Sequence, residues 1–528
     1  MKRLLLFAFA VSGAAALVYE VTWTRALSLM MGSTTYAVST MLATFMAGLA
    51  LGGFFGGKLA DRYNNLYLLF GLMEFGIGVF GLVTIPIMNS LPPLYFAILD
   101  SFAFSPKLYF LFQFILCSLV MIVPTTLMGA TFPIVSKALT IDTGSVGKGI
   151  GNAYSSNTFG AIIGSIAAGF LLIPILGVKA TTFIAAGGNV LVSIVLLWSS
   201  GVWNRRRITV VLLCLFMVPG VMAFASKEKE WTASFFLSRR HPSYEQFVAS
   251  HANDTVLMDK DYREGRVKLW KTQSGHYLLS VGGKIEGTAP VDMANTLLLA
   301  YLPLSSHRGA ESFLNIGLGV GVTLAAAKQQ VRSVTLVEIN DGVLEAIGRY
   351  GPSGVLDGVD IELNDARNYL LLTDKKFDVI SSEPSYPSEA STANLFTREF
   401  YEIAEDALNP GGVYAQWLPY YELSNDDVTM MLKTFGSVFN YVYLWKVPES
   451  LDLIMVGSNE RFGLSAEQIR ERAHTMNTSG KELDFILSKS PEEVRELISA
   501  NPEIPLNTDN LPILEYHVVR NILAGVRD

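Results

Sequence analysis

The sequence predicts a chain of two parts, an α-helical transmembrane bundle followed by an α/β domain that opens with a small β-sheet. Hydrophobic residues make up 50% of the 528 positions, charged residues only 16%, and mean hydropathy is +0.36, which is unusual for a soluble protein. Nearly all uncharged runs of membrane-spanning length lie before Ala225. After Thr255, short strand-like segments and a strand, glycine loop and helix pattern replace them.

These shifts in composition divide the chain into four segments. We expect a bundle over 1–225, a linker over 226–254, a small β-rich subdomain with a helix over 255–310, and the main α/β domain over 311–528. The net charge of −7 and the pI near 5.6 leave no basic face for nucleic acid. The two cysteines fall inside apolar runs and the six histidines lack ligand spacing, so neither a disulfide framework nor a metal site is expected.

Seven apolar runs reach or approach the ~20 residues that a bilayer crossing needs. They cover residues 4–30, 34–58, 66–90, 108–136, 152–176, 180–202 and 208–225. The first continues without a convincing cleavage site, so we expect it to stay in the mature protein. Glycine and alanine crowd the runs, as in AGLALGGFFGG and FGAIIGSIAAG, which favours close packing of helices.

Three ionisable residues, Glu20, Arg25 and Glu74, lie in or at the edges of these runs. Such a group is unfavourable in lipid unless it faces a partner or a water-filled cavity, which makes each a candidate functional residue. The alternative is that its charge reaches the membrane interface along a flexible side chain.

Clusters of Lys and Arg in alternate loops orient the bundle with its amino terminus in the cytoplasm. The clusters are Lys2 and Arg3, Lys58 and Arg62, Lys137 and Lys148, and Arg205 to Arg207. We therefore expect a multi-pass protein of the cell (inner) membrane. Seven spans would place the α/β domain outside the cytoplasm and six would place it inside. The short last run contains Pro219 and Gly220, which favours the cytoplasmic side.

The soluble part carries chemistry-bearing residues at the ends of its expected strands. VLMDKD, GRVKLWKT and HYLLSVGGK predict a small antiparallel sheet. The segment SFLNIGLGVGVTLAAAKQ then reads as a strand, a loop with Gly317, Gly319 and Gly321, and a helix, typical of nucleotide-binding α/β folds. The next strand, SVTLVEIN, ends in Glu338, nineteen positions after Gly319, where an acid can hold both hydroxyls of a ribose.

Two further strands, DIELND and FDVISSE, end in Asp365 and Glu383. Ends of neighbouring parallel strands meet at one edge of a sheet, so we expect Glu338, Asp365 and Glu383 to converge on one adenosyl-sized, positively charged ligand. The alternative for any single one of these acids is a helix cap or a solvated turn.

Several motifs in order resemble the spermidine synthase-like aminopropyltransferases. They are IGLGVG, VEIN, DAR at 365–367, VISSEP, ANLFTREFYEIAEDALNPGGVYAQW and NTDNLPILEY, over about residues 255–520. The pair GLGVG and EPSYP is most similar to a membrane-fused branch whose amino-terminal half resembles a truncated major-facilitator-type transporter. GGKLADR at 56–62 is similar to a cytoplasmic loop of such transporters. The resemblance implies a Rossmann-like, class I methyltransferase-type fold.

The resemblance also implies roles for single residues. Gly317, Gly319 and Gly321 would form the loop around the methionine-like part of the donor, and Glu338 would hold its ribose. Asp365 with Ala366 would face the adenine, and Pro384 would border the reaction centre with Glu383.

Three residues would be catalytic: Glu383, Tyr386 and Asp292. Soluble members carry D-x-x-D-P where this chain has Glu383-Pro384-Ser385-Tyr386-Pro387, so tyrosine stands in place of their base.

Two functions stay open from the sequence. One is a membrane-anchored transferase that uses S-adenosylmethionine or its decarboxylated form as co-substrate, without a metal, on a small amine or a membrane-associated acceptor. The other is a polyamine-like solute transporter or sensor with a degenerate transferase domain. The expected partners are the lipid bilayer and, by the family's habit, a second copy in a homodimer; nucleic acid is not among them.

Overall fold

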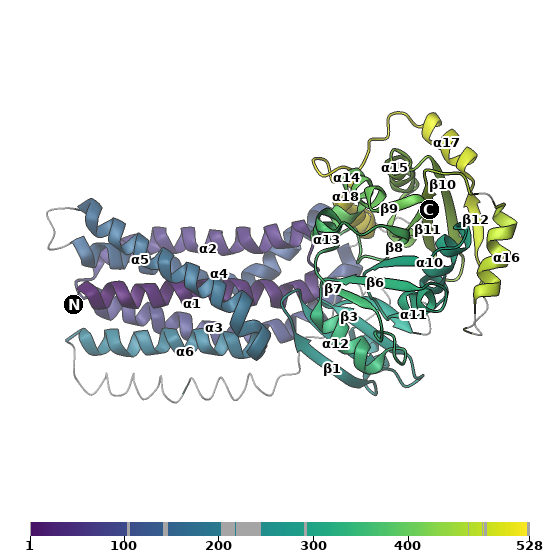
Figure 1. Cartoon of the computed structure of the whole chain (residues 1–528). Coiled ribbons are helices and arrows are strands. Elements are labelled where there is room, and N and C mark those ends of the chain that lie inside the picture. Colours follow the sequence, from purple (N-terminus) through teal and green to yellow (C-terminus); the bar gives the residue numbers. More distant parts are fainter. Residues whose placement is uncertain are drawn as a thin grey trace. The chain divides into compact units, whose positions relative to one another are not determined.

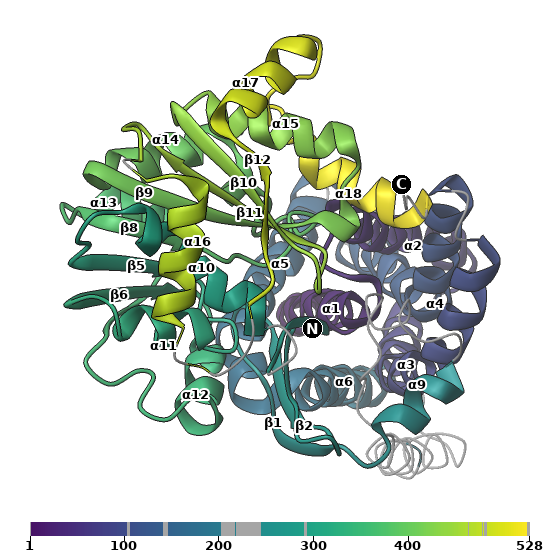
Figure 2. The same cartoon turned by 90° about the vertical axis from the view of Figure 1, so that its right-hand side faces the viewer.

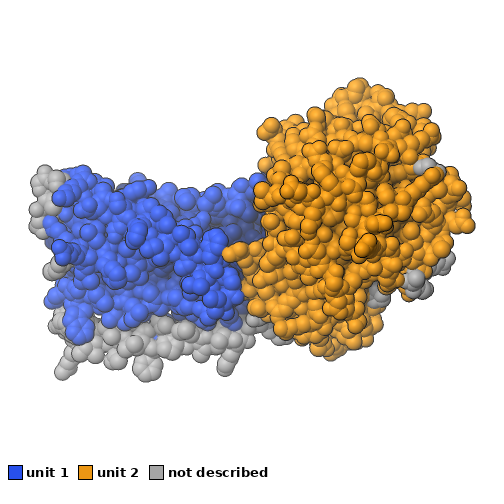
Figure 3. Space-filling view, viewed as in Figure 1, with its two compact units in different colours: residues 1–102, 107–248 blue, residues 103–106, 249–528 orange. Residues whose placement is uncertain are grey.

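The computed structural model describes residues 2–102, 106–140, 146–201, 217, 244–289, 293–462, 464–477, 479 and 483–524. The chain forms two compact units (Figure 3), one of residues 1–102 and 107–248 and the other of residues 103–106 and 249–528. The expected seventh span, 208–225, and the expected linker up to residue 243 lie outside the described residues apart from Met217.

The first unit is a bundle of long helices that run side by side (Figure 1). Their bounds are Lys2–Met31 (α1), Thr35–Arg62 (α2), Leu66–Phe102 (α3), Pro106–Thr140 (α4), Val146–Ala167 (α5) and Ile173–Ser199 (α6), with a π-helical turn at Ala168–Leu172 (η1). A short helix, Tyr244–His251 (α9), follows later in the chain. These six helices occupy the first six expected spans.

The chain reverses direction inside the continuous apolar stretch 146–199. Gly177 has φ +79° and ψ 166°, a non-helical conformation that glycine adopts without a steric penalty. The helix before it, α5, and the helix that contains it, α6, both pack against α1. Ala10 and Ala14 of α1 meet Gly160 and Gly164 of α5, so these two helices run parallel. The stretch therefore makes two passes.

Glycines bring helix backbones into direct contact in the bundle. A Cβ at Gly52 would lie 2.1 Å from the carbonyl oxygen of Thr126, and one at Gly160 would lie 1.8 Å from that of Ala10. Only glycine fits at these contacts, so the small-residue runs are indeed packing surfaces. Lys137 on α4 donates to the carbonyl of Ala60 on α2 at 2.8 Å and extends the same contact.

The bundle has the length and surface that a membrane protein needs. Among the described residues, five helical stretches are long and apolar enough to cross a bilayer, the fifth being the 54-residue stretch 146–199. Large apolar side chains are exposed on its outside, among them Phe54, Phe159, Phe170, Ile175, Leu191 and Trp198. Exposed apolar surface on this scale suits contact with lipid.

A polar cluster lies inside the bundle around Glu74 of α3. Its side chain is fully buried and accepts hydrogen bonds from Ser12 Oγ of α1 at 2.5 Å and from Asn189 Nδ2 of α6 at 2.7 Å. Glu74 thus faces protein partners rather than the membrane interface.

The second unit begins with a four-stranded antiparallel sheet in the order β1-β2-β3-β4. Its strands are Thr255–Asp261, Arg266–Lys271, Tyr277–Val281 and Lys284–Ala289. The first three were expected; β4 was not. Gly282 and Gly283, with φ +58° and +84°, form the two-residue turn that pairs Lys284 with Val281.

An eight-stranded sheet follows, in the order β12-β10-β11-β9-β8-β5-β6-β7 (Figure 2). Its strands are Ser312–Ile316 (β5), Ser333–Glu338 (β6), Asp360–Leu363 (β7), Phe377–Ser382 (β8), Leu408–Pro419 (β9), Tyr441–Val447 (β10), Asp452–Ser458 (β11) and Ile486–Lys489 (β12). The strands β5 to β9 are parallel to one another, and β10 to β12 add an antiparallel edge through the pairing of β11 with β9.

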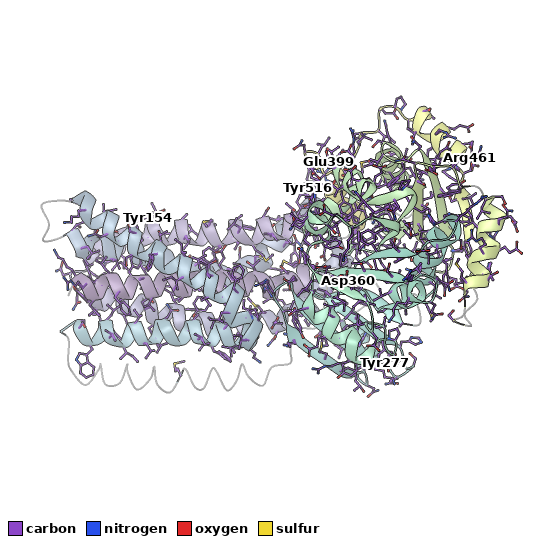
Figure 4. The ribbon with its side chains drawn as sticks, in the orientation of Figure 1. Tyr154, Tyr277, Asp360, Glu399, Arg461 and Tyr516 are labelled. Carbon is purple, nitrogen blue, oxygen red and sulfur yellow. The ribbon has the colours of Figure 1, made fainter. Side chains whose placement is uncertain are left out.

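Helices cover both faces of this sheet. They are Met293–Ser306 (α10), Val322–Lys328 (α11), Asp341–Tyr350 (α12), Ala366–Leu372 (α13), Arg398–Asp406 (α14), Asn425–Gly436 (α15), Ala466–Met476 (α16), Pro491–Ala500 (α17) and Ile513–Ala524 (α18), with 3₁₀ turns at Ala393–Phe396 (η2) and Tyr420–Glu422 (η3). Their side chains fill the space between sheet and helices (Figure 4).

The five parallel strands have the doubly wound order, with β5 and β8 side by side at the centre. After β5 the chain adds β6 and β7 on one side of β5, and then β8 and β9 on the other side. The boundary between β5 and β8 is therefore the switch point at which ligands bind in open α/β sheets. The expected Rossmann-like fold is confirmed, and it places the loops after β5 and β8 next to each other.

Candidate active site

The loop after β5 is held tightly against the loop after β8. Gly317 has φ +81° and donates its N–H to the carbonyl of Val337 at 2.9 Å. A Cβ at this position would lie 2.6 Å from the carbonyl oxygen of Glu383. The two loops therefore meet at Gly317, and this contact leaves room for glycine alone.

The other two glycines of the loop, Gly319 and Gly321, have different structural roles. Gly319 has φ +50°, and no atom lies within 4 Å of where its Cβ would be, so its backbone is open to a ligand. Gly321, φ +81°, precedes α11 and donates to the carbonyl of Leu318 at 2.8 Å, which closes the turn. Its own Cβ would press on Ile347 at 2.9 Å.

Glu338, at the end of β6, is buried, and its carboxylate is tied to the glycine loop. One oxygen accepts the N–H of Leu318 at 2.9 Å and the other accepts the N–H of Asn340 at 2.8 Å. Burial raises the pKa of Glu338, while these backbone donors act in the opposite direction. Each carboxylate oxygen keeps a second lone pair, which can accept a ribose hydroxyl.

Asp365 lies at the start of α13, where its side chain accepts the N–H of Asn368 at 3.0 Å. This is a helix cap, the alternative that the sequence left open. The neighbouring Asn364 donates its N–H to the carbonyl of Glu338, so the ends of β6 and β7 are side by side. Ala366, the first residue of α13, is buried. The structure shows no side-chain contact of Asp365 with Glu338 or Glu383, and a ligand role for Asp365 stays a prediction.

Glu383 follows β8 and points toward the helix after the glycine loop. Its carboxylate accepts the hydroxyl of Thr323, in the first turn of α11, at 2.9 Å, and its N–H donates to the carbonyl of Ile316 at 3.0 Å. The buried Pro384 fixes the chain directly behind it. Glu338 and Glu383 thus contact the two ends of the segment 318–323, and a shared ligand stays a prediction.

Tyr386 lies two residues beyond Pro384 in an aromatic group. Its ring meets that of Trp417 edge to face at 5.4 Å between centroids, and Tyr421 donates its hydroxyl to the Tyr386 oxygen at 2.9 Å. Trp417 is fixed in turn by donating its ring N–H to Asp452 at 3.0 Å. Asp292, the third expected catalytic residue, lies outside the described residues.

The small sheet contributes charged groups that were not expected from the sequence. The Nζ atom of Lys284 lies 3.2 Å from the centre of the Tyr386 ring and 3.9 Å from a carboxylate oxygen of Glu389. Glu286 accepts the hydroxyl of Ser385 at 2.6 Å.

The bonding of β4 explains how Glu286 reaches the loop after β8. Leu279 pairs with Gly287 and Ser280 with Ile285, which leaves Glu286 unpaired in a β-bulge. Bulges redirect a side chain and are common beside active sites. A Cβ at Gly287 would lie 2.9 Å from Val320, so β4 also packs on the glycine loop.

The site combines an open glycine loop, an acid that can hold a ribose, and a cluster of acidic and aromatic side chains around Tyr386, called the acidic aromatic pocket below. Among the described residues, no group of three or more His, Cys, Asp or Glu side chains is arranged to hold a metal ion. The arrangement can bind a nucleoside carrying positive charge and place a second molecule near Tyr386.

Comparison with known proteins agrees with this geometry. Residues 293–460 match the family model described as the spermine/spermidine synthase domain. Polyamine aminopropyltransferase 1 of Bacillus cereus is 27% identical over 249 residues, which is 44% of this chain and 88% of that protein. Polyamine aminopropyltransferase of Escherichia coli O1:K1 / APEC is 28% identical over 181 residues, 32% of this chain and 62% of that protein, so the chain spans less than two thirds of this relative.

Similar solved structures are a spermidine synthase in complex with the transition state analogue AdoDATO and the spermidine synthase of Thermotoga maritima. The TM-scores are 0.38 and 0.37, with 21% and 22% identity. Each covers 47% of this chain, and the chain covers 88% and 87% of them. The family match confirms the resemblance that the motifs predict for the second unit.

Proposed function

We propose that this chain transfers an aminopropyl group from decarboxylated S-adenosylmethionine to an amine, because residues 293–460 match the spermine/spermidine synthase domain. The relatives are named polyamine aminopropyltransferases, which supports the reaction class. The single observation that carries the proposal is the meeting of Gly317 with the Glu383 carbonyl at the switch point, with Glu338 tied to the same loop.

The residues present fit such a donor. The open backbone at Gly319 admits the donor chain, and Glu338 has lone pairs for the ribose hydroxyls. The carboxylate of Glu383 favours a cationic sulfonium ion and would repel the carboxylate that S-adenosylmethionine keeps. The acidic pocket thus favours the decarboxylated donor.

The transfer is a substitution at carbon. The lone pair of the acceptor amine forms the C–N bond, the C–S bond breaks, and sulfur leaves with the bonding pair as methylthioadenosine. The proton released from nitrogen passes to a basic group of the site or to water. Glu383 and Tyr386 flank the pocket from which the amine attacks, and alignment of amine, carbon and sulfur is the protein's main contribution.

Donor binding and turnover of the full-length protein test this function. We expect decarboxylated S-adenosylmethionine to bind in calorimetry and to release methylthioadenosine when an amine mixture is added. Glu338→Ala should abolish binding, whereas Glu467→Ala, an exposed acid in the first turn of α16, should leave it unchanged. Binding that survives in Glu338→Ala, or no methylthioadenosine with any amine, would reject the proposal.

We further propose that the bundle anchors the enzyme in the cell membrane with the transferase domain in the cytoplasm. Six passes over the described residues return the chain to its starting side, and the Lys and Arg clusters favour a cytoplasmic amino terminus. The donor is a cytosolic metabolite, which supports the same side. A reporter that is active only in the cytoplasm should be active when it is fused after Asp528. Activity there of a reporter that works only outside the cytoplasm would refute this placement.

A second function, passage or sensing of a cationic solute through the bundle, is favoured by the cluster around Glu74. Two more polar atoms there, Tyr19 Oη and Asn189 Oδ1, are buried without a hydrogen-bond partner among the described residues. A buried acid with unsatisfied neighbours inside a bundle is typical of a solute or proton site. Uptake of a labelled diamine into reconstituted vesicles should be lost in Glu74→Gln and kept in Ser90→Ala; uptake no faster than in protein-free vesicles would reject it.

A further inference from the structure

Lys284 is a buried lysine inside the candidate active site. Its side chain is only 2% exposed, although a lysine on a short strand normally extends to solvent. The two-glycine turn before it and the bulge after it fix its direction. Burial lowers the pKa of Lys284, and the charges of Glu389, Glu422 and Glu286 act in the opposite direction.

The groups around Lys284 have the chemistry that recognises an alkylammonium ion. The face of the Tyr386 ring lies 3.2 Å from Nζ, and Glu389 lies 3.9 Å away. An aromatic face with surrounding carboxylates is a common receptor for an ammonium group on an alkyl chain. In this protein that receptor already contains a cation of the chain itself.

The location of Lys284 relates it to the acceptor and not to the donor. The donor-facing groups are the glycine loop and Glu338, whereas Lys284 contacts Tyr386, which lies past Pro384 on the far side of Glu383 in the chain. The hydrogen bond from Ser385 to Glu286 also joins β4, the strand that carries Lys284, to the loop after β8. An acceptor that approaches Tyr386 therefore meets the Lys284 charge.

We propose that Lys284 supplies the cation that this acidic aromatic pocket holds, so that the acceptor is an amine with one ammonium group and not a diamine. This inference rests on the proposed aminopropyl transfer and specifies its acceptor. A second ammonium of a diamine would have to share the pocket with Lys284, and like charges placed side by side in a buried site strongly disfavour binding. A monoamine presents its single nitrogen to the donor and an uncharged tail to the pocket.

The test compares two acceptors of equal length, butylamine and butane-1,4-diamine, with decarboxylated S-adenosylmethionine as donor. The full chain in detergent is used, and kcat/KM is measured from methylthioadenosine release. The wild type should prefer the monoamine by about tenfold or more, and Lys284→Gln should shift the ratio toward the diamine by about a hundredfold.

A matched control is available on the same sheet. Lys271 is exposed and its Nζ lies 5.3 Å from the centre of the Tyr277 ring, the residue labelled on β3 in Figure 4. Lys271→Gln should leave the acceptor ratio unchanged. Lys284→Met provides a second variant if the glutamine variant does not fold, and the preference of the wild type is informative by itself.

Three results would overturn the inference alone: a wild type that uses the diamine as well as the monoamine, equal loss of both activities in Lys284→Gln, or an aminopropyl group found on Lys284 by mass spectrometry. Equal loss would assign the lysine a structural role, and the modified lysine would make it an acceptor itself. Donor binding without methylthioadenosine release for any amine would instead reject the proposed transfer, and with it this acceptor assignment.

Discussion

Replacing Gly317 with alanine tests whether contact between the two central loops builds the donor site. Gly309, eight positions earlier, is its matched control because both glycines have φ +81°. No atom lies within 4 Å of a Cβ at Gly309, whereas a Cβ at Gly317 would lie 2.6 Å from the Glu383 carbonyl. The two alanine variants therefore share the backbone strain, and only one adds a clash.

The expected magnitudes follow from these two contributions. In Gly309→Ala the new alanine has to adopt the left-handed backbone conformation of the glycine, which should lower the free energy of unfolding by about 1 kcal/mol. A clash with a backbone atom adds about 1–3 kcal/mol, so Gly317→Ala should lose about 2–4 kcal/mol. With about 2–4 °C per kcal/mol for a domain of this size, thermal unfolding should separate the variants clearly.

Calorimetry with decarboxylated S-adenosylmethionine then measures the effect on the site. Gly309→Ala should bind as the wild type does. Gly317→Ala should bind at least about tenfold more weakly, because about 1.4 kcal/mol of lost loop positioning corresponds to that factor. Equal affinities in the two variants would refute the idea that the loops after β5 and β8 form one binding surface.

Three other predictions concern single side chains. Tyr386→Phe removes the oxygen that accepts the Tyr421 hydroxyl, and should lower kcat by about a hundredfold with an unchanged donor Kd in calorimetry; a loss confined to Kd would contradict a role in turnover. Burial and the charge of Glu389 raise the pKa of Glu286 from 4.5 to about 7, so its contribution to stability is fully present below pH 4.5 and is lost as pH rises through 7. Between these pH values the melting temperature of the wild type should fall by several degrees relative to that of Glu286→Gln. Parallel melting curves of the two proteins would contradict the raised pKa. Glu74→Ala leaves Ser12 and Asn189 without their acceptor, and should lower the melting temperature of the bundle more than Glu74→Gln does, which a fluorescence melt in detergent measures; indistinguishable melts would contradict the buried cluster.

The parts of the fold that sequence reasoning predicted depend on local patterns. The apolar runs marked six helices, including the interruption of the stretch 146–199 that Gly177 makes near the start of α6. The glycine loop, Glu338 and Glu383 were found because each stands where a strand ends, and strand ends of a parallel sheet meet. Asp365 shows the limit of this reasoning, since the same position also suits a helix cap.

Lys284 and Glu286 were missed because they reach Tyr386 and Ser385 through contacts between distant segments. Glu286 and Ser385 are 99 positions apart, and Trp417 reaches Tyr386 from yet another strand. In the sequence Lys284 reads as a solvent-exposed charge. The signal that could have found it is the Gly282-Gly283 pair, which predicts a hairpin and therefore a fourth strand beside β3.

The β-bulge at Glu286 also bears on how proteins of this kind are compared. The recognisable family segment begins at residue 293, yet Lys284 and Glu286 precede it. A fragment trimmed to that segment would keep the glycine loop, Glu338 and Glu383 and lose β4, the strand to which we assign the choice of amine. If that assignment holds, the hairpin in front of the matched segment is where substrate choice is encoded.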